Sequence, residues 1–303
     1  MQIYYTTLLI QELRRMNLLK NKDKENKIWT LYHANLRTKT IIITIIASLI
    51  LITVFLSNFL IDSNTLTTNF QFINQAPSFE HPFGTDWMGR DMFTRTLLGL
   101  GLSIGVGAFA SVISTCVAII LGLLSSINKI TDEFVAAIID LFGSIPHILL
   151  IILVSISFGG GFYGVIMGVG LTHWTPLARV LRAEIKKIKT TDYVKLSQQL
   201  GKSKLWVAKE HILPLVISQI IVGVILMFPH AIMHEASISF LGFGLSPHEP
   251  AIGIILAESM NYLSLGCWWL AFYPGISLLI LVLLFDLIGE NVNKLLNPQS
   301  AQK

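Results

Sequence analysis

Four histidines of this sequence lie inside apolar stretches, where an ionisable side chain is rare and is by default a functional candidate. They are His147, His173, His230 and His234. His230 and His234 are four residues apart, so a helix places both on one face, with Met227 three residues earlier on the same side. Imidazole is a favoured ligand of Ni²⁺. We therefore predict a transient metal path; the alternative is that each histidine only bonds a neighbouring helix.

A membrane metalloenzyme is a second interpretation of these residues. It would use His230, His234 and Glu235 as ligands, but their spacing is not HExxH. The remaining residues supply no third ligand at a spacing typical of such a metal site. Cys116 and Cys267, both in apolar context, provide neither a disulfide framework nor a CxxC pair. We therefore expect no catalytic residues and no cofactor.

The elements that must hold these histidines are membrane helices. The 303-residue chain is 53% hydrophobic and only 13% charged, whereas soluble proteins carry about 25% charged residues. Its apolar stretches are long enough to cross a hydrocarbon core of about 30 Å. They predict an all-α integral membrane protein with six spans, at residues 40–61, 97–124, 134–158, 162–181, 212–233 and 268–288.

The predicted spans place the histidines along one direction. Pro146 directly precedes His147 and predicts a kink near the middle of the third span. His173 falls in the fourth span, and His230 and His234 fall near the outer end of the fifth. The four side chains are therefore expected to line one route from the exterior to the interior.

The positive charges predict the orientation of the chain. Of the 22 Lys and Arg residues, 20 fall on one side of the six predicted spans and 2 on the other. The positive-inside rule then places both termini in the cytoplasm of a multi-pass cell-membrane protein. The basic segment 1–39 is expected to be a cytoplasmic arm, and the span at 40–61 is too long for a cleaved signal peptide. The net charge of +4 is too small to indicate nucleic-acid binding.

One long polar and basic segment, 191–214, interrupts the apolar second half of the chain. Asp192 is a good N-cap for a short helix. Gly201 stands where that helix would close with a left-handed residue. The apolar side chains between them follow helical spacing and predict an amphipathic helix: Tyr193, Leu196 and Leu200.

A second short helix is predicted directly after the first. Ser203 can cap a helix that starts at Lys204, and Pro214 is acceptable in the first turn of the long apolar helix that follows. The sequence Gly-Lys-Ser that starts at Gly201 mimics the end of a phosphate-binding loop, but Leu196 stands where that motif needs a glycine. We therefore expect no ATP site of this kind.

A predicted external loop over 62–96 ends in the sequence HPFGTDWMGRD, which begins at His81. Its two glycines permit tight turns. Asp86, Arg90 and Asp91 can satisfy one another where the chain re-enters the membrane.

Together these segments resemble the ATP-binding-cassette importer permeases of the dipeptide, oligopeptide and nickel family, in particular their C-type subunits. The loop at 62–96 is similar to that family's HxxGTDxxGRD motif, and the sequence SFLGFG from Ser239 is similar to its SFLGLG. Trp174 to Glu184 is similar to its W…AR..R.E pattern. The segment 191–214 resembles its cytoplasmic "EAA" loop. The resemblance covers residues 40–298 and leaves a cytoplasmic tail at 299–303.

The resemblance implies the type I importer permease fold and a coupling helix that docks on an ATPase subunit. Lys195, Leu196 and Ser197 stand where the family has Glu-Ala-Ala, so the family's acidic contact is missing. The residues expected to couple to the ATPase are Tyr193, Val194, Lys195, Leu196, Ser197, Leu200 and Gly201.

The resemblance also implies partners: a homologous second permease, two ATP-binding subunits and an extracytoplasmic binding protein. The chain is then a transport permease and not an enzyme, because ATP is hydrolysed by the partners. His173 beside Trp174, and the pair His230 and His234 before SFLGFG, resemble the nickel permeases more than the dipeptide ones. Nickel or a nickel chelate is therefore the first predicted cargo, received by His230 and His234 from the binding protein. Di- and oligopeptides are the alternative.

Overall fold

The computed structural model describes residues 37–61 and 66–296. The chain divides into two compact units, Met1–Ile46 and Ala47–Lys303. The described residues of the first unit form the opening turns of the helix Arg37–Leu60. This helix confirms the first predicted span. Most of the predicted arm 1–39 and the whole predicted tail 299–303 lie outside the described residues.

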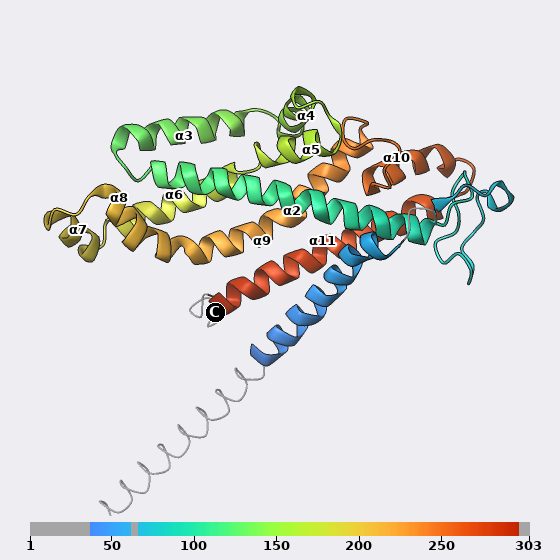
Figure 1. Ribbon diagram of the computed structural model, residues 1–303, viewed down its shortest axis with the longest axis horizontal. Helices are drawn as coiled ribbons and strands as arrows, with labels where there is room; N and C mark the ends of the chain where they lie inside the picture. Colours follow the sequence, from blue (N-terminus) through green and yellow to red (C-terminus); the bar gives the residue numbers. More distant parts are fainter. Residues whose placement is uncertain (1–36, 62–65, 297–303) are drawn as a thin grey trace, which may run out of the picture. The chain divides into compact units, whose positions relative to one another are not determined.

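Three long apolar helices run through the second unit. They are α2 (Met92–Leu124), α9 (Leu213–Phe240) and α11 (Trp269–Leu296). Each exceeds the roughly 20 residues that a membrane crossing needs. The helix α9 contacts both of the others, and the three run lengthwise beside one another (Figure 1).

Glycines allow α9 to approach its neighbours closely. A Cβ atom on Gly107 of α2 would lie 2.9 Å from Cγ1 of Ile232. A Cβ atom on Gly289 of α11 would lie 2.5 Å from Cδ2 of Leu226. Small residues at these crossings therefore let the helices pack more tightly than larger side chains would permit.

The predicted third span is two helices, α3 (Lys129–Ser144) and α4 (His147–Ser157), which meet at 98°. Ile145 is extended, with φ −92° and ψ 135°, as expected for a residue that precedes proline. Pro146 then becomes the N-cap of α4. The expected kink is thus a complete break, and His147 is the first residue after it.

The predicted fourth span is also divided, into α5 (Gly161–Gly170) and α6 (Thr175–Lys189). Pro176, in the first turn of α6, has no N–H and cannot continue a helix from α5. The turn between them is closed by Trp174, whose Nε1 donates to the Leu171 carbonyl at 3.0 Å.

The expected count of six single-helix spans is therefore corrected. Within residues 37–61 and 66–296, four helices can cross a membrane alone, and the bent pair α3–α4 makes a fifth candidate. A further helix, α10 (Ile252–Leu263), follows the SFLGFG turn and was not predicted.

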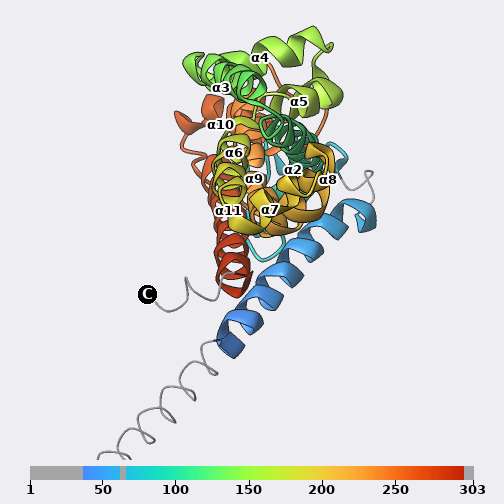
Figure 2. The same ribbon diagram turned by 90° about the vertical axis from the view of Figure 1, so that its left-hand side faces the viewer.

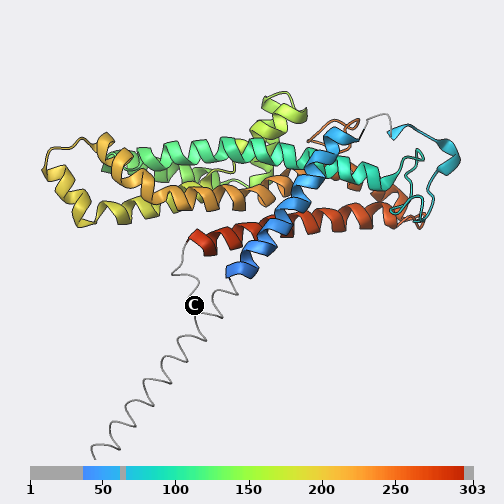
Figure 3. The same cartoon turned by 60° about the horizontal axis from the view of Figure 1, so that its bottom comes forward.

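Two loop regions lie at opposite ends of the second unit (Figures 1 and 3). One holds the short helices α7 (Asp192–Gln199) and α8 (Lys204–Val207), and the other is the segment 66–91. Viewed from the α7 end, α2, α6 and α11 surround α9 (Figure 2). The helix α9 carries His230 and His234, and together with the helices packed against it runs between the two loop regions.

Candidate functional site

The helix α7 closes as the sequence predicts. Gly201 has φ +82°, a left-handed conformation that glycine adopts without strain. Its N–H donates to the Gln198 carbonyl at 3.0 Å, and the N–H of Lys202 donates to the Ser197 carbonyl at 3.2 Å. These two bonds form a Schellman motif. The N-cap is Thr191 and not Asp192, which is the first helical residue.

The two faces of α7 differ in exposure. Val194 is fully buried in the apolar cluster that also contains Val207 and Ile212. The predicted apolar side chains instead point outward, and Lys195 is also exposed. The exposed fractions are 45% for Tyr193, 56% for Leu196 and 72% for Leu200. The described residues thus leave an apolar stripe on the surface of this helix.

A histidine joins α7 to the long helix that follows. His211 Nε2 lies 2.8 Å from Ser197 Oγ, and its ring contacts those of Tyr193 and Trp206 at centroid distances of 5.6 and 5.2 Å. His211 belongs to a π-helical turn, η3 (Ala208–Ile212), between α8 and α9.

The run from α8 into α9 is one helical path. Ser203 caps α8 as predicted, since its Oγ accepts from the Trp206 N–H at 3.2 Å. The wider π turn precedes Pro214, which lacks an N–H to donate. The chain is therefore helical without a break from Lys204 to Phe240.

An ion-pair group fixes the same end of the unit between α3 and α6. Arg182 donates to both carboxylate oxygens of Asp132, at 2.5 and 3.0 Å, and Lys186 Nζ lies 2.7 Å from the same carboxylate. Lys189 Nζ donates to the Ser126 carbonyl at 2.8 Å. These bonds hold α6, which leads into α7, against the start of α3.

At the opposite end, the loop 66–91 is organised by a buried carboxylate. Asp86 accepts from the N–H groups of Met88 and Arg90, from Arg90 Nε at 2.7 Å and from Arg95 Nη1 at 3.1 Å. Arg95 also pairs with Glu258 at 2.7 Å. The predicted pairing of Asp86 with Arg90 is therefore confirmed.

Asp91 does not join that pair. It caps α2 by accepting from the Thr94 N–H at 2.8 Å, and its other oxygen lies 2.9 Å from His81 Nδ1. Arg95 and Glu258 were not singled out from the sequence, because they are 163 residues apart and no local spacing relates them.

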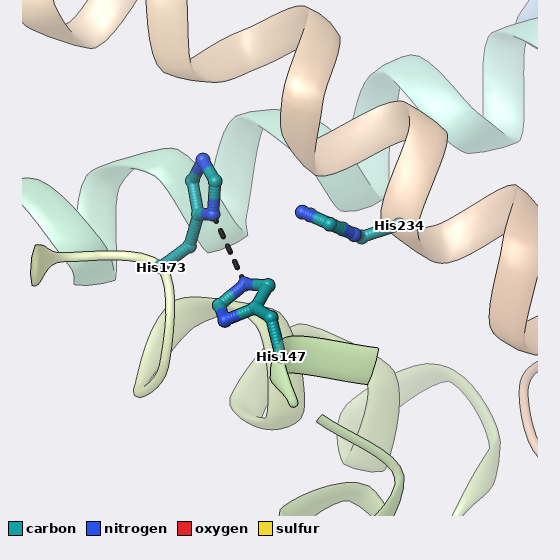
Figure 4. A group of neighbouring side chains, drawn as sticks. All are labelled: His147, His173 and His234. Atoms are coloured by element: carbon teal, nitrogen blue, oxygen red, sulfur yellow. Dashed lines mark hydrogen bonds between the residues drawn. The ribbon is translucent and has the colours of Figure 1, made fainter. Parts of the chain in front are cut away.

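The four histidines meet in one cluster. His173 Nδ1 lies 3.2 Å from His147 Nε2, and one nitrogen from each of His147, His173 and His234 fits within 4.8 Å of the others. Figure 4 shows these three rings converging from separate segments. His230 adjoins them, with its ring centroid 5.7 Å from that of His173. We expected the four histidines to follow one another along a route through the protein. The structure instead places them in a single cluster.

Breaks in the helices create this group. His147 opens α4 after the α3–α4 break, and His173 stands in the turn between α5 and α6. His230 and His234 lie on α9 just after Pro229. A cavity of about 460 Å³ adjoins the cluster and is lined by His173, His230 and Met227.

Glu235 takes no part in the cluster. It is fully buried and accepts from Ser103 Oγ at 2.5 Å and from Ser239 Oγ at 2.9 Å. The hypothetical metalloenzyme ligand set of His230, His234 and Glu235 is therefore not assembled. Ser103 was not anticipated, since it is distant in sequence from Glu235.

Comparison with known proteins places these features in a family. Residues 87–299 match the family model described as the binding-protein-dependent transport system inner membrane component. The dipeptide transport system permease protein DppC of Bacillus subtilis is 30% identical over 227 residues, which are 75% of this chain and 71% of that protein. The oligopeptide transport system permease protein OppC of the same organism is 32% identical over 234 residues, 77% of this chain and 76% of that protein.

A solved structure shares the fold. The inward-facing MetNI methionine ABC transporter contains a chain that superposes with a TM-score of 0.57 at 17% identity. The superposition covers 68% of this chain and 98% of the other. Over the superposed part, this chain therefore has the fold of that transporter chain.

Proposed function

Because this chain belongs to the family of binding-protein-dependent transport system inner membrane components, and is thus a membrane permease subunit of an ATP-binding-cassette importer, we propose that its cargo is short peptides. One observation carries the proposal: two relatives that align over three quarters of the chain are dipeptide and oligopeptide permeases. Nickel, the cargo predicted first from the sequence, is not named for either of them.

The cavity beside the histidines supports peptide transport. Its volume of about 460 Å³ lies in the range of small-molecule sites, and its wall is largely apolar with a few polar groups. Gln219 is one of these, and its buried Oε1 has no hydrogen-bond partner in the described part of the chain. It could accept a peptide N–H.

Partner subunits follow from the exposed stripe on α7. An apolar surface of this kind favours association, and Tyr193, Leu196 and Leu200 suit a groove on an ATP-binding subunit. One chain offers one such helix. We propose that the working importer contains a homologous second permease, two ATP-binding subunits and an extracytoplasmic binding protein.

The contacts around α7 supply a coupling mechanism. When ATP draws the two ATP-binding subunits together, each is expected to pull its docked α7. The Ser197–His211 contact and the continuous path from α8 into α9 carry that motion to the cavity wall. Transport then proceeds by alternating access.

We also propose the orientation in the cell membrane. The α7–α8 end would face the cytoplasm and the loop 66–91 the exterior, since nine of the 22 Lys and Arg residues lie from Arg179 to Lys209. Both termini would then be cytoplasmic. Residues 40–298 would form the permease domain, with the coupling loop at 191–214 between an N-terminal arm, 1–39, and a tail, 299–303.

Uptake by the reconstituted importer tests the cargo. Vesicles that contain the chain, its second permease and the ATP-binding subunits should accumulate labelled di- and oligopeptides when ATP and the binding protein are supplied. A catalytic-site variant of the ATP-binding subunit is the control for leakage. Accumulation of nickel without any peptide uptake would reject the peptide proposal.

Nickel or a nickel chelate remains a second candidate because one observation favours it. Imidazole suits Ni²⁺, and four histidines form one cluster, two of which, His173 and His230, line the cavity. The same vesicles, supplied with labelled Ni²⁺ in place of peptide, separate the two cargoes.

A further inference from the structure

We propose that His147, His173 and His234 form a binding site for a late first-row transition-metal ion, with His230 next to it as a further ligand. The inference goes beyond the proposed peptide cargo, because metal binding by these residues does not depend on what the importer carries. Its meaning for transport does rest on the permease assignment.

The spacing of the ring nitrogens fits one ion. Two imidazole nitrogens bound at about 2.0–2.1 Å in a tetrahedral arrangement lie about 3.3–3.4 Å apart. His147 Nε2 and His173 Nδ1 are 3.2 Å apart, and the three candidate ligand atoms all fall within 4.8 Å of one another. A small rotation of His234 toward that pair would complete a three-nitrogen site (Figure 4).

The hydrogen bonding of the cluster leaves nitrogens available. The pair His147 and His173 shares one hydrogen bond, whereas His234 has no hydrogen-bond partner among residues 37–61 and 66–296. His147 and His234 are half-buried and His230 is exposed, so ring nitrogens of the cluster are open to an incoming ion, which has only the His147–His173 hydrogen bond to displace. The structural alternative, in which each histidine bonds a neighbouring helix, accounts for only one pair.

The surroundings select the class of ion. Within the part of the chain that the structure describes, no carboxylate forms an ion pair with the cluster, and the adjacent Glu235 is bound to Ser103 and Ser239. Mg²⁺ and Ca²⁺ require oxygen ligands, so they are excluded. A set of imidazoles alone suits Zn²⁺, Cu²⁺ and Ni²⁺.

The location favours an ion that enters and leaves. The ligands come from two helix breaks and from α9 after Pro229, and the adjoining cavity is lined by His173 and His230. Broken helices that line a cavity are a recurring way to build binding sites inside transport proteins. Three imidazoles also leave coordination positions open, which a bare ion fills with water and a chelated ion with its chelator.

Metal binding by the purified full chain tests the site. The chain should be placed in lipid nanodiscs with an affinity tag that contains no histidine, and dialysed against Ni²⁺ or Zn²⁺. One ion per chain is expected. The single variants His147→Ala, His173→Ala and His234→Ala should each weaken binding by more than the roughly 10- to 100-fold that loss of an outer-shell partner costs. The exposed His248 supplies the matched control, His248→Ala, which should bind like the unaltered chain.

A spectroscopic measurement on the unaltered chain tests the ligands without requiring any variant to fold. Cu²⁺ bound to the unaltered chain should show nitrogen couplings from several imidazoles in its electron paramagnetic resonance spectrum. A second arm adds Ni²⁺ with an excess of a dipeptide, and retention there identifies a chelated ion. Absence of a stoichiometric ion in every arm, or binding that survives the triple alanine variant, would overturn the site. Peptide uptake is unaffected by that outcome, so the two proposals fail separately.

Discussion

Ser197 Oγ lies 2.8 Å from His211 Nε2, which ties the exposed helix α7 to the base of α9 by a side-chain bond. Ser197 occupies the last position of the family's Glu-Ala-Ala triplet. The bond therefore joins α7 to the π-helical turn η3 two residues after Lys195, which stands at the acidic position of that triplet.

The first prediction concerns this bond. His211→Ala removes the hydrogen bond and the ring contacts with Tyr193 and Trp206, so coupling should weaken roughly two- to tenfold, as expected for about 0.5–1.5 kcal/mol. The ratio of transported peptide to hydrolysed ATP measures it. Glu210→Ala, an exposed neighbour, is the control and should keep the normal ratio.

The second prediction concerns the end of α7. Gly201→Val places a β-branched residue at φ +82° and should strain the Schellman closure by about 1–2 kcal/mol. No atom lies within 4 Å of the added Cβ, so the defect arises from the backbone alone. Peptide-stimulated ATPase activity should fall while membrane insertion remains. Gly105→Ala, also with open space around it but in a regular helix, should leave activity unchanged.

The third prediction concerns Arg95, which is 3% exposed and contacts both Asp86 and Glu258. Arg95→Met leaves Asp86 paired with Arg90 but removes the short ion pair of Glu258, and it should cost about 1–3 kcal/mol. A lower midpoint of thermal unfolding in detergent would show the loss. Lys129→Ala, which removes a highly exposed pair with Glu133, should change stability by less than about 1 kcal/mol.

The fourth prediction is topological. After Cys116 and Cys267 are replaced by serine, a membrane-impermeant thiol reagent added to intact cells should label Cys introduced for His248. It should not label Cys introduced for Lys202 unless the cells are opened. Labelling of position 202 in intact cells contradicts the proposed orientation, and labelling in broken cells confirms that the site is reactive.

The sequence predicted what depends on local chemistry. The closure of α7 follows from Gly201 and the cap of α8 from Ser203, because each needs only its chain neighbours. The long helices follow from apolar runs. The break before His147 was anticipated only as a kink, since its 98° angle is set by packing as well as by Pro146.

Contacts between distant segments were not predictable. The types of the four histidines pointed to metal chemistry, but their convergence depends on two helix breaks and on how α4, α5 and α9 pack. The bonds from Arg95 to Glu258 and from Ser103 to Glu235 join residues far apart in the chain. No sequence spacing encodes such pairs, because only the tertiary fold brings them together.

The π-helical turn at Ala208–Ile212 has a consequence for how the chain tolerates change. It holds one residue more than an α-helical turn. Loss of a single residue there would restore an α-helical turn and keep the helix continuous, so His230 and His234 would keep nearly the same orientation relative to α7. This turn is thus the place in the helical path where the chain tolerates a change of length by one residue.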